Sequence, residues 1–180
     1  KSTKIDTAKN LLEKIFIVLR NETGCNFGDY KSSTVIRRID KRMALNQIDK
    51  LENYLKYIQR DREEVLKLFK ELLIGVTSFF RDTEAYEALQ KVIIPEILDK
   101  KQDGETIRIW VAGSSTGEEA YSLAILFDEE IRNCSKNLKV QIFASDIDGD
   151  AINLARQGIY PETIAADVGT KRLTRYFLKD

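Results

Sequence analysis

The 180-residue sequence contains no histidine and only two cysteines, two prolines and one tryptophan. The lack of histidine excludes Ser-His-Asp and Cys-His nucleophilic systems and most zinc sites. Cys25 and Cys134 lie far apart in the sequence, so the spacing predicts neither a metal-binding knuckle nor a disulfide framework. We therefore expect no metal, and any catalysis must proceed without imidazole.

The sequence also lacks a net charge and a long apolar run. Its 29 basic residues balance 29 acidic residues, which argues against non-specific attraction to nucleic acid or to a membrane. No apolar run approaches the roughly 20 residues of a membrane span, and the first residues have no signal-peptide core. We therefore expect a cytoplasmic protein that neither binds nucleic acid nor inserts directly into a membrane.

The first part of the chain has helical periodicity. One apolar stripe consists of Leu11, Leu12, Ile15, Phe16 and Leu19. A second helix is predicted over about 33–44. The pairs Asp49/Glu52 and Asp61/Glu64 have the spacing of helix capping boxes and place helices at about 50–59 and 62–73. These patterns predict an all-helical N-terminal domain over residues 1–74.

The segment 75–82 breaks this pattern and is predicted to be a linker. A helix over about 83–98 follows, and the remaining pattern alternates strands at 107–111 and 140–144 with helices that follow them. This order implies a parallel sheet with right-handed crossovers. We expect Phe79 and Phe80 to pack the linker onto this second domain, and Trp110 to pack between sheet and helix.

The predicted fold class is therefore α/β, with a helical domain followed by a Rossmann-like domain over residues 83–180. Only two strands of the parallel sheet can be identified, whereas sheets of this kind usually have about five or more. We expect residues 83–180 to form only the N-terminal part of a catalytic domain. Such a part is predicted to bind its cofactor weakly and to turn over poorly.

A glycine-bounded turn joins the first strand to the next helix. Gly113 and Gly117 allow a sharp turn and let a ligand approach the backbone. A helix N-terminus favours phosphate, but Glu118 and Glu119 would repel it, so a cationic ligand is favoured. Asp146 follows the second strand and is placed to bind a ribose, although its surroundings are also typical of a simple turn.

Four blocks in succession, 76–82, 109–122, 143–148 and 155–160, resemble the chemotaxis-receptor glutamate methyltransferases, the CheR family. The resemblance includes 35–43 and so covers most of the chain. Segments 73–77 and 160–167 look most like versions fused to sensor or methylesterase domains in larger signalling proteins. The resemblance implies transfer of a methyl group from S-adenosylmethionine, leaving S-adenosylhomocysteine, to glutamates on the cytoplasmic helical region of a receptor.

The resemblance also implies roles for single residues. Glu119 would bind the methionine end of the cofactor and Asp146 its ribose. Thr77 and Arg81 would complete the pocket, with Arg81 near the reacting centre, as the catalytic candidate, or near the cofactor carboxylate. Gly75 is a departure, because many family members have an asparagine there that touches the cofactor. That contact is lost here or replaced by backbone or water.

A basic cluster lies in the second predicted helix. Ile36 is among the residues expected to face inward, which leaves one exposed side with four basic residues: Arg37, Arg38, Lys41 and Arg42. Such a charge run is commonly just a solvated helix face. The resemblance favours substrate binding, in which these residues face an acidic receptor helix and electrostatic steering speeds the encounter.

The charge chemistry of the turn agrees with this resemblance. S-adenosylmethionine carries a sulfonium and an ammonium but no phosphate, so an acidic pair attracts it. A glutamate acceptor is ionised at neutral pH and needs no general base. Two alternatives remain: a non-catalytic methyltransferase-like signalling module, and a nicotinamide-dependent oxidoreductase, which the acidic turn disfavours.

Overall fold

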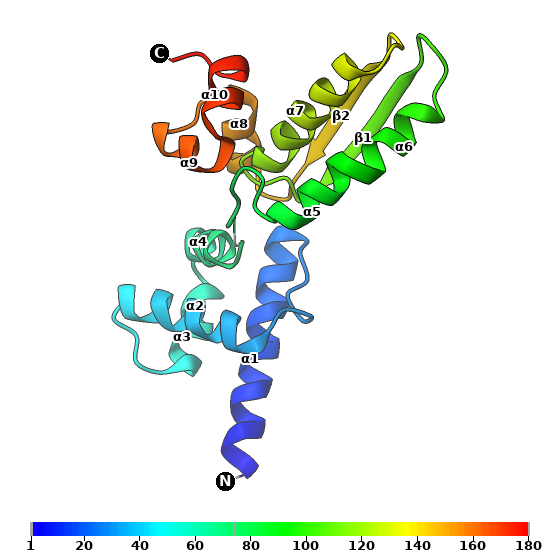
Figure 1. The fold of residues 1–180 in the computed structure, drawn as a ribbon. Helices are drawn as coiled ribbons and strands as arrows, with labels where there is room; N and C mark the ends of the chain where they lie inside the picture. The colour runs from blue at the N-terminus through cyan, green and yellow to red at the C-terminus, as the bar shows by residue number, and fades with distance from the viewer. Residues whose placement is uncertain (1, 74, 180) are drawn as a thin grey trace. The chain divides into compact units, whose positions relative to one another are not determined.

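The computed structural model describes residues 2–73 and 75–179, with side chains from residue 9 onward. These residues form two compact units, which divide between positions 74 and 75. Among the described residues, the first unit is built from helices and the second contains both strands (Figure 1). Each unit has its own apolar core, so each can be described by itself.

The first unit consists of α1 (Ser2–Thr23), α2 (Ser32–Leu45), α3 (Leu51–Ile58) and α4 (Arg62–Leu72). Ile15 and Leu19 of α1 are fully buried, and the rest of the predicted stripe packs beside them. The core also includes Tyr54 of α3 and Leu68 of α4, both 0% exposed. The predicted all-helical N-terminal domain is confirmed.

Several local predictions in this unit differ from the structure. The capping box at Asp49 is wrong, because α3 begins after Lys50 and has no side-chain cap. At α4, Asp61 does accept a hydrogen bond from the Glu64 amide (3.1 Å), but the Glu64 side chain does not complete the box. It pairs with two residues of other helices instead. Ile36 is 46% exposed, and the neighbouring Val35 takes the buried position.

The second unit begins with the linker and continues through a series of short elements. They are α5 (Thr83–Ala88), η1 (Leu89–Ile93), α6 (Ile94–Asp99), β1 (Thr106–Ala112), α7 (Glu118–Asn133), β2 (Lys139–Ser145), α8 (Gly149–Gln157), η2 (Glu162–Ile164), α9 (Ala165–Val168) and α10 (Thr170–Tyr176). The single helix predicted over 83–98 thus has a π-helical turn, η1, in its middle. Pro95 is the second residue of α6, where its missing N–H prevents a regular α-helical bond to the preceding turn.

The two strands pair in parallel, which confirms the predicted sheet. Their register pairs Thr106 with Lys139 at one end and Ala112 with Ser145 at the other. Because the carboxyl ends of the strands meet, the turn after β1 and the loop after β2 lie at the same edge of the sheet. This edge positions the candidate site.

The two faces of this sheet have different surroundings. Ile107 is buried in one cluster with residues of α6 and α7, and Val111 on the same face is 2% exposed. Alternation places Trp110 and its cross-strand neighbour Phe143 on the opposite face, where they are 72% and 49% exposed. The prediction that Trp110 packs between sheet and helix is therefore wrong. Its indole N–H donates to Ser145 Oγ (2.9 Å), and the described residues leave that face largely open.

Membrane insertion was not expected from the sequence. Within the described ranges, no helix combines the length and the apolar character needed to cross a bilayer.

Candidate functional site

The glycine turn after β1 is held against the end of β2. The amides of Gly113 and Ser114 both donate to the Ser145 carbonyl, at 2.7 and 3.0 Å. Gly113 and Gly117 have φ of 75° and 98°, and Ser115 has φ of 47°. A non-glycine residue in this region costs about 1–3 kcal/mol and is commonly retained at functional sites. The strained turn is therefore a candidate binding element.

Asp146 is joined to this turn by its side chain. One carboxylate oxygen accepts the Ser115 amide at 2.7 Å, and the other accepts the Asp148 amide at 2.8 Å. Asp146 thus has the turn-forming role that its surroundings predict. Each oxygen still has a free lone pair, since a carboxylate can accept about four hydrogen bonds. The side chain, which is half-buried, can bind a ligand hydroxyl as well.

The linker lies against the same turn. A Cβ at Gly75 would be 3.0 Å from Ser115 Oγ, so the two residues are neighbours. Phe79 and Phe80 are 1% and 7% exposed, which confirms that they pack the linker onto the second domain. Arg81 is exposed, and its guanidinium donates to the Val76 carbonyl (2.6 Å), which closes the linker into a loop.

The remaining predicted cofactor residues, Thr77 and Glu119, lie in the linker and at the start of α7. Thr77 is half-buried in the linker loop, and Glu119 is exposed in the first turn of α7 beside Glu118. Glu118 accepts a hydrogen bond from the Thr116 hydroxyl at 2.7 Å. Burial raises the pKa of the Tyr86 phenol, and the negative charge of Glu119 raises it further. The helix start is therefore acidic, as the sequence predicts, and disfavours phosphate.

Two buried hydroxyls of the turn test whether a polar ligand fits here. Ser114 and Ser115 are 1% and 9% exposed, and their Oγ atoms have no hydrogen-bond partner within 2–73 and 75–179. A buried hydroxyl without a partner costs about 1–3 kcal/mol. A ligand with hydroxyl, amino or carboxylate groups would satisfy them. The donors, acceptors and carboxylates of the site thus fit a polar, phosphate-free cofactor with positive charge.

Two residues that support the site were not assigned from the sequence. Ser122 of α7 is fully buried and accepts the Phe80 amide at 3.1 Å. Tyr160 donates to the Thr116 carbonyl (2.7 Å) and packs edge-to-face on Phe79. Ser122 could have been found as a polar residue on the apolar stripe of α7, and Tyr160 as the last residue of the fourth resembling block.

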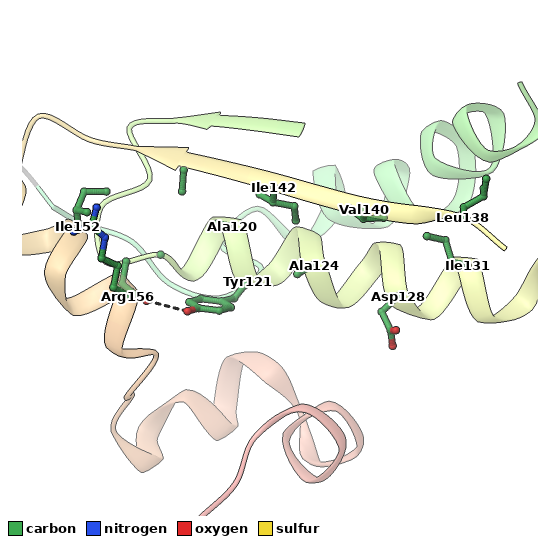
Figure 2. A pocket seen from close by; sticks show the side chains of 13 residues that line it. Ala120, Tyr121, Ala124, Asp128, Ile131, Leu138, Val140, Ile142, Ile152 and Arg156 are labelled. Carbon is green, nitrogen blue, oxygen red and sulfur yellow. Dashed lines mark hydrogen bonds between the residues drawn. The ribbon is translucent and has the colours of Figure 1, made fainter. Parts of the chain in front are cut away.

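A separate groove of about 630 Å³ runs between α7 and β2, with α8 at one end (Figure 2). Its lining is largely apolar and includes Ala124, Ile131 and Ile142. Tyr121 at one end donates to the Ala155 carbonyl (2.9 Å). Of the predicted cofactor residues, only Gly117 lines it. The groove is therefore distinct from the candidate cofactor site.

The basic residues of α2, in the first unit, do not share one exposed side. Arg37 is exposed, whereas Arg38 and Lys41 reach Glu71 of α4 at 3.9 and 2.8 Å. The Arg42 side chain is only 13% exposed and pairs with the buried Glu64. The predicted exposure of Arg42 is wrong, because a carboxylate from α4 draws its guanidinium into the domain.

Comparison with known sequences identifies both domains. The all-alpha domain of CheR methyltransferases matches residues 10–73, and the SAM binding domain of CheR methyltransferases matches residues 75–180. The chain belongs to the CheR methyltransferase family. The predicted S-adenosylmethionine-binding domain is thus present, and the family match agrees with the predicted resemblance.

Individual relatives show how much of each relative's length this chain covers. It is 33% identical over 177 residues to chemotaxis protein methyltransferase 1 of Pseudomonas aeruginosa, covering 95% of this chain and 64% of the relative. The chain is 29% identical over 162 residues to the chemotaxis protein methyltransferase of Borreliella burgdorferi, and this match covers 88% of this chain and 57% of the relative. An uncharacterized 104.1 kDa protein of Rhodobacter capsulatus is 41% identical over 166 residues, 92% of this chain but 17% of that protein. The chain spans less than two thirds of each.

Proposed function

We propose that the protein to which this chain belongs transfers a methyl group from S-adenosylmethionine to glutamate side chains on the cytoplasmic helical region of a chemotaxis-type receptor. The observation that carries this proposal is the meeting of three segments at one edge of the sheet. The linker, the glycine turn and Asp146 contact one another through Ser115. The family match supplies the cofactor class.

Each segment would hold a different part of the cofactor. Asp146 accepts the ribose hydroxyls with its remaining lone pairs, while Gly113 and Gly117 keep the backbone close to the ligand. Glu119 attracts the positively charged methionine end. From the linker, Thr77 and Arg81 close the pocket, with Arg81 beside the reacting centre or the cofactor carboxylate. When the cofactor binds, the buried hydroxyls of Ser114 and Ser115 gain a hydrogen-bond partner.

The reaction suits a site without histidine. The chemistry that the cofactor supplies when bound is an electrophilic methyl group on a sulfonium, which a carboxylate can attack without a general base. The products are a neutral methyl ester and S-adenosylhomocysteine. The side chains of the site then have the tasks of alignment and water exclusion, and alignment can lower the barrier by up to about 7–11 kcal/mol.

Receptor binding is proposed for the basic residues of α2. Arg37 offers an exposed charge, and Lys41 is half-exposed despite its pair with Glu71. Arg38 contributes less, because it is partly covered, and Arg42 supports the surface from inside the domain. The exposed charges would attract an acidic receptor helix. Sensor or methylesterase domains fused to this chain are part of the proposal, and the size of the Rhodobacter capsulatus relative supports a larger parent.

The proposal is tested by incubating the whole protein with a receptor's cytoplasmic fragment and S-adenosylmethionine labelled with tritium in its methyl group. We expect label to enter the fragment and to leave it in base as methanol, as a glutamyl ester requires. Cofactor binding without any transfer would instead indicate a non-catalytic signalling module.

The same assay tests the basic surface through Arg37→Glu. We expect methylation at low salt to slow by roughly threefold to tenfold, with little difference from wild type at high salt, because screening removes steering. Lys56→Glu on the exposed side of α3 is the matched control, since it changes the net charge equally. Equal rates for the two variants at low salt would count against receptor binding by α2.

A further inference from the structure

The backbone of Phe80 has an unfavourable conformation in the middle of the cofactor-binding linker. Its φ is 50°, in the left-handed region, which costs about 1–3 kcal/mol for a residue with a bulky side chain. Phe80 directly precedes Arg81 and lies three residues after Thr77. The conformation of Phe80 therefore determines how the two proposed pocket residues are presented. Some contact of the fold must hold it.

Three contacts hold Phe80. Its amide donates to the buried Ser122 hydroxyl (3.1 Å), and its ring packs edge-to-face on Tyr86, with ring centroids 5.4 Å apart. The guanidinium carbon of Arg172, from α10, lies 4.5 Å from the centroid of the Phe80 ring. This distance is well within the range of cation–π attraction. Of these three contacts, only the one made by Arg172 comes from α10. Arg172 lies 92 residues after Phe80 in the sequence.

Arg172 is itself fixed in place by a polar cluster. Its Nε and Nη2 donate to both carboxylate oxygens of Glu129, at 2.9 and 2.7 Å, and Nη2 also donates to the Gln90 side chain at 3.3 Å. The Gln90 amide in turn donates to Glu129 and Glu130. Gln90 belongs to the π-helical turn η1, a rare conformation that is frequent at functional sites. The two-pronged geometry requires an arginine, since lysine cannot reproduce it.

We propose that Arg172, oriented by Glu129 and Gln90, is a positioning residue for cofactor binding. By packing on Phe80, it keeps the linker in the strained conformation that presents Thr77 and Arg81 to the pocket. The inference rests on the proposed function, and it adds α10 to the elements on which cofactor affinity depends. The polar partners of Arg172 are Glu129 and Gln90, and its contact with the linker is the Phe80 ring, so its effect on the pocket passes through Phe80.

The experiment measures S-adenosylhomocysteine affinity by calorimetry in the whole protein. Arg172→Met is expected to weaken binding about tenfold, which corresponds to about 1.4 kcal/mol, while thermal unfolding shows a folded protein. Arg175→Met on the same helix is the matched control, because Arg175 is exposed and faces the Tyr176 ring instead. Its affinity should equal that of wild type. Arg172→Lys keeps the positive charge but loses the paired hydrogen bonds to Glu129. Its affinity is expected to stay close to that of Arg172→Met.

A second readout separates positioning from general stability. In Arg172→Met the Phe80 amide should exchange its hydrogen faster, while amides in β1 keep their wild-type protection. Combining Arg172→Met with Phe80→Leu should weaken binding no more than either change alone, because both remove the same contact. Additive effects, or wild-type affinity in a folded Arg172→Met variant, would overturn this inference but not the proposed function. No binding by the unchanged protein would overturn the proposed function and the inference with it.

Discussion

Replacing Arg42 with methionine is expected to lower the free energy of unfolding of the helical domain by about 3–5 kcal/mol, the usual effect of removing one partner of a buried ion pair. Glu64 is 1% exposed, and its two oxygens accept from Arg42 Nε and Nη2 at 2.9 and 2.6 Å. Tyr54 donates to one of the same oxygens at 2.9 Å. Without Arg42, the buried carboxylate would lose its positively charged partner and keep neutral hydrogen-bond donors such as the Tyr54 phenol.

Hydrogen exchange of the slowest amides in α2 and α4 measures this change within the domain. Arg37→Met is the matched control, since Arg37 is exposed on the same helix and the substitution should alter stability by less than about 0.5 kcal/mol. Equal stability of the two variants would show that the ion pair contributes nothing.

The same ion pair predicts a pH dependence of stability. Burial raises the pKa of the Glu64 carboxyl, but hydrogen bonds from Arg42 and Tyr54 outweigh burial and hold that pKa below its usual value of 4.5. The unfolded chain therefore binds this proton more tightly than the folded chain. The contribution to stability is complete above about pH 4.5 and is lost as the pH falls through the folded-state pKa. Arg42→Met should remove most of this acid-dependent loss.

Gly117→Ala is expected to destabilise the second domain by at least about 2 kcal/mol and to weaken cofactor binding with it. The φ of 98° costs an alanine about 1–3 kcal/mol. The new Cβ would also lie 2.9 Å from the Ala155 Cβ and 3.0 Å from Tyr160 Oη, and overpacking adds a further 1–3 kcal/mol, roughly. Because Tyr160 donates to the Thr116 carbonyl, its displacement would disturb the turn directly.

The chain offers a matched control for this substitution. Gly149 begins α8 with no left-handed φ, and a Cβ there meets nothing within 4 Å. Gly149→Ala should leave stability within about 0.5 kcal/mol or raise it slightly, because alanine restricts the unfolded chain. Thermal unfolding of both variants distinguishes the two cases. Similar midpoints would mean that the turn tolerates a side chain at position 117.

The sequence predicts the core of the candidate site because few arrangements satisfy its pattern. Two strands with a helix between them pair in parallel, and their carboxyl ends then meet. That topology alone brings Gly113 beside the loop that holds Asp146. The double role of Asp146, as turn former and as ligand acceptor, could not be decided from spacing. It depends on the position of the Ser115 amide, which only the folded turn fixes.

Other features depend on partners that lie far away in the sequence. A basic run looks the same whether it faces water, a receptor or a buried carboxylate, and Arg42 meets Glu64 22 residues later. The exposure of Trp110 follows from strand alternation together with the absence of a covering element among the described residues. The left-handed backbone of Phe80 has no sequence signal, since the contacts that hold it, with Ser122, Tyr86 and Arg172, form only in the folded domain.

The central claim is that the linker, the turn and Asp146 form a site for S-adenosylmethionine. Its most direct test is a calorimetric titration of the whole protein with S-adenosylhomocysteine and, separately, with NADH. We predict one bound S-adenosylhomocysteine, affinity weakened about tenfold or more by Asp146→Asn through loss of charged hydrogen bonds, and no change with Asp167→Asn at an exposed position of α9. NADH should not bind. Tight binding of NADH, or S-adenosylhomocysteine affinity that does not respond to Asp146→Asn, would contradict the account.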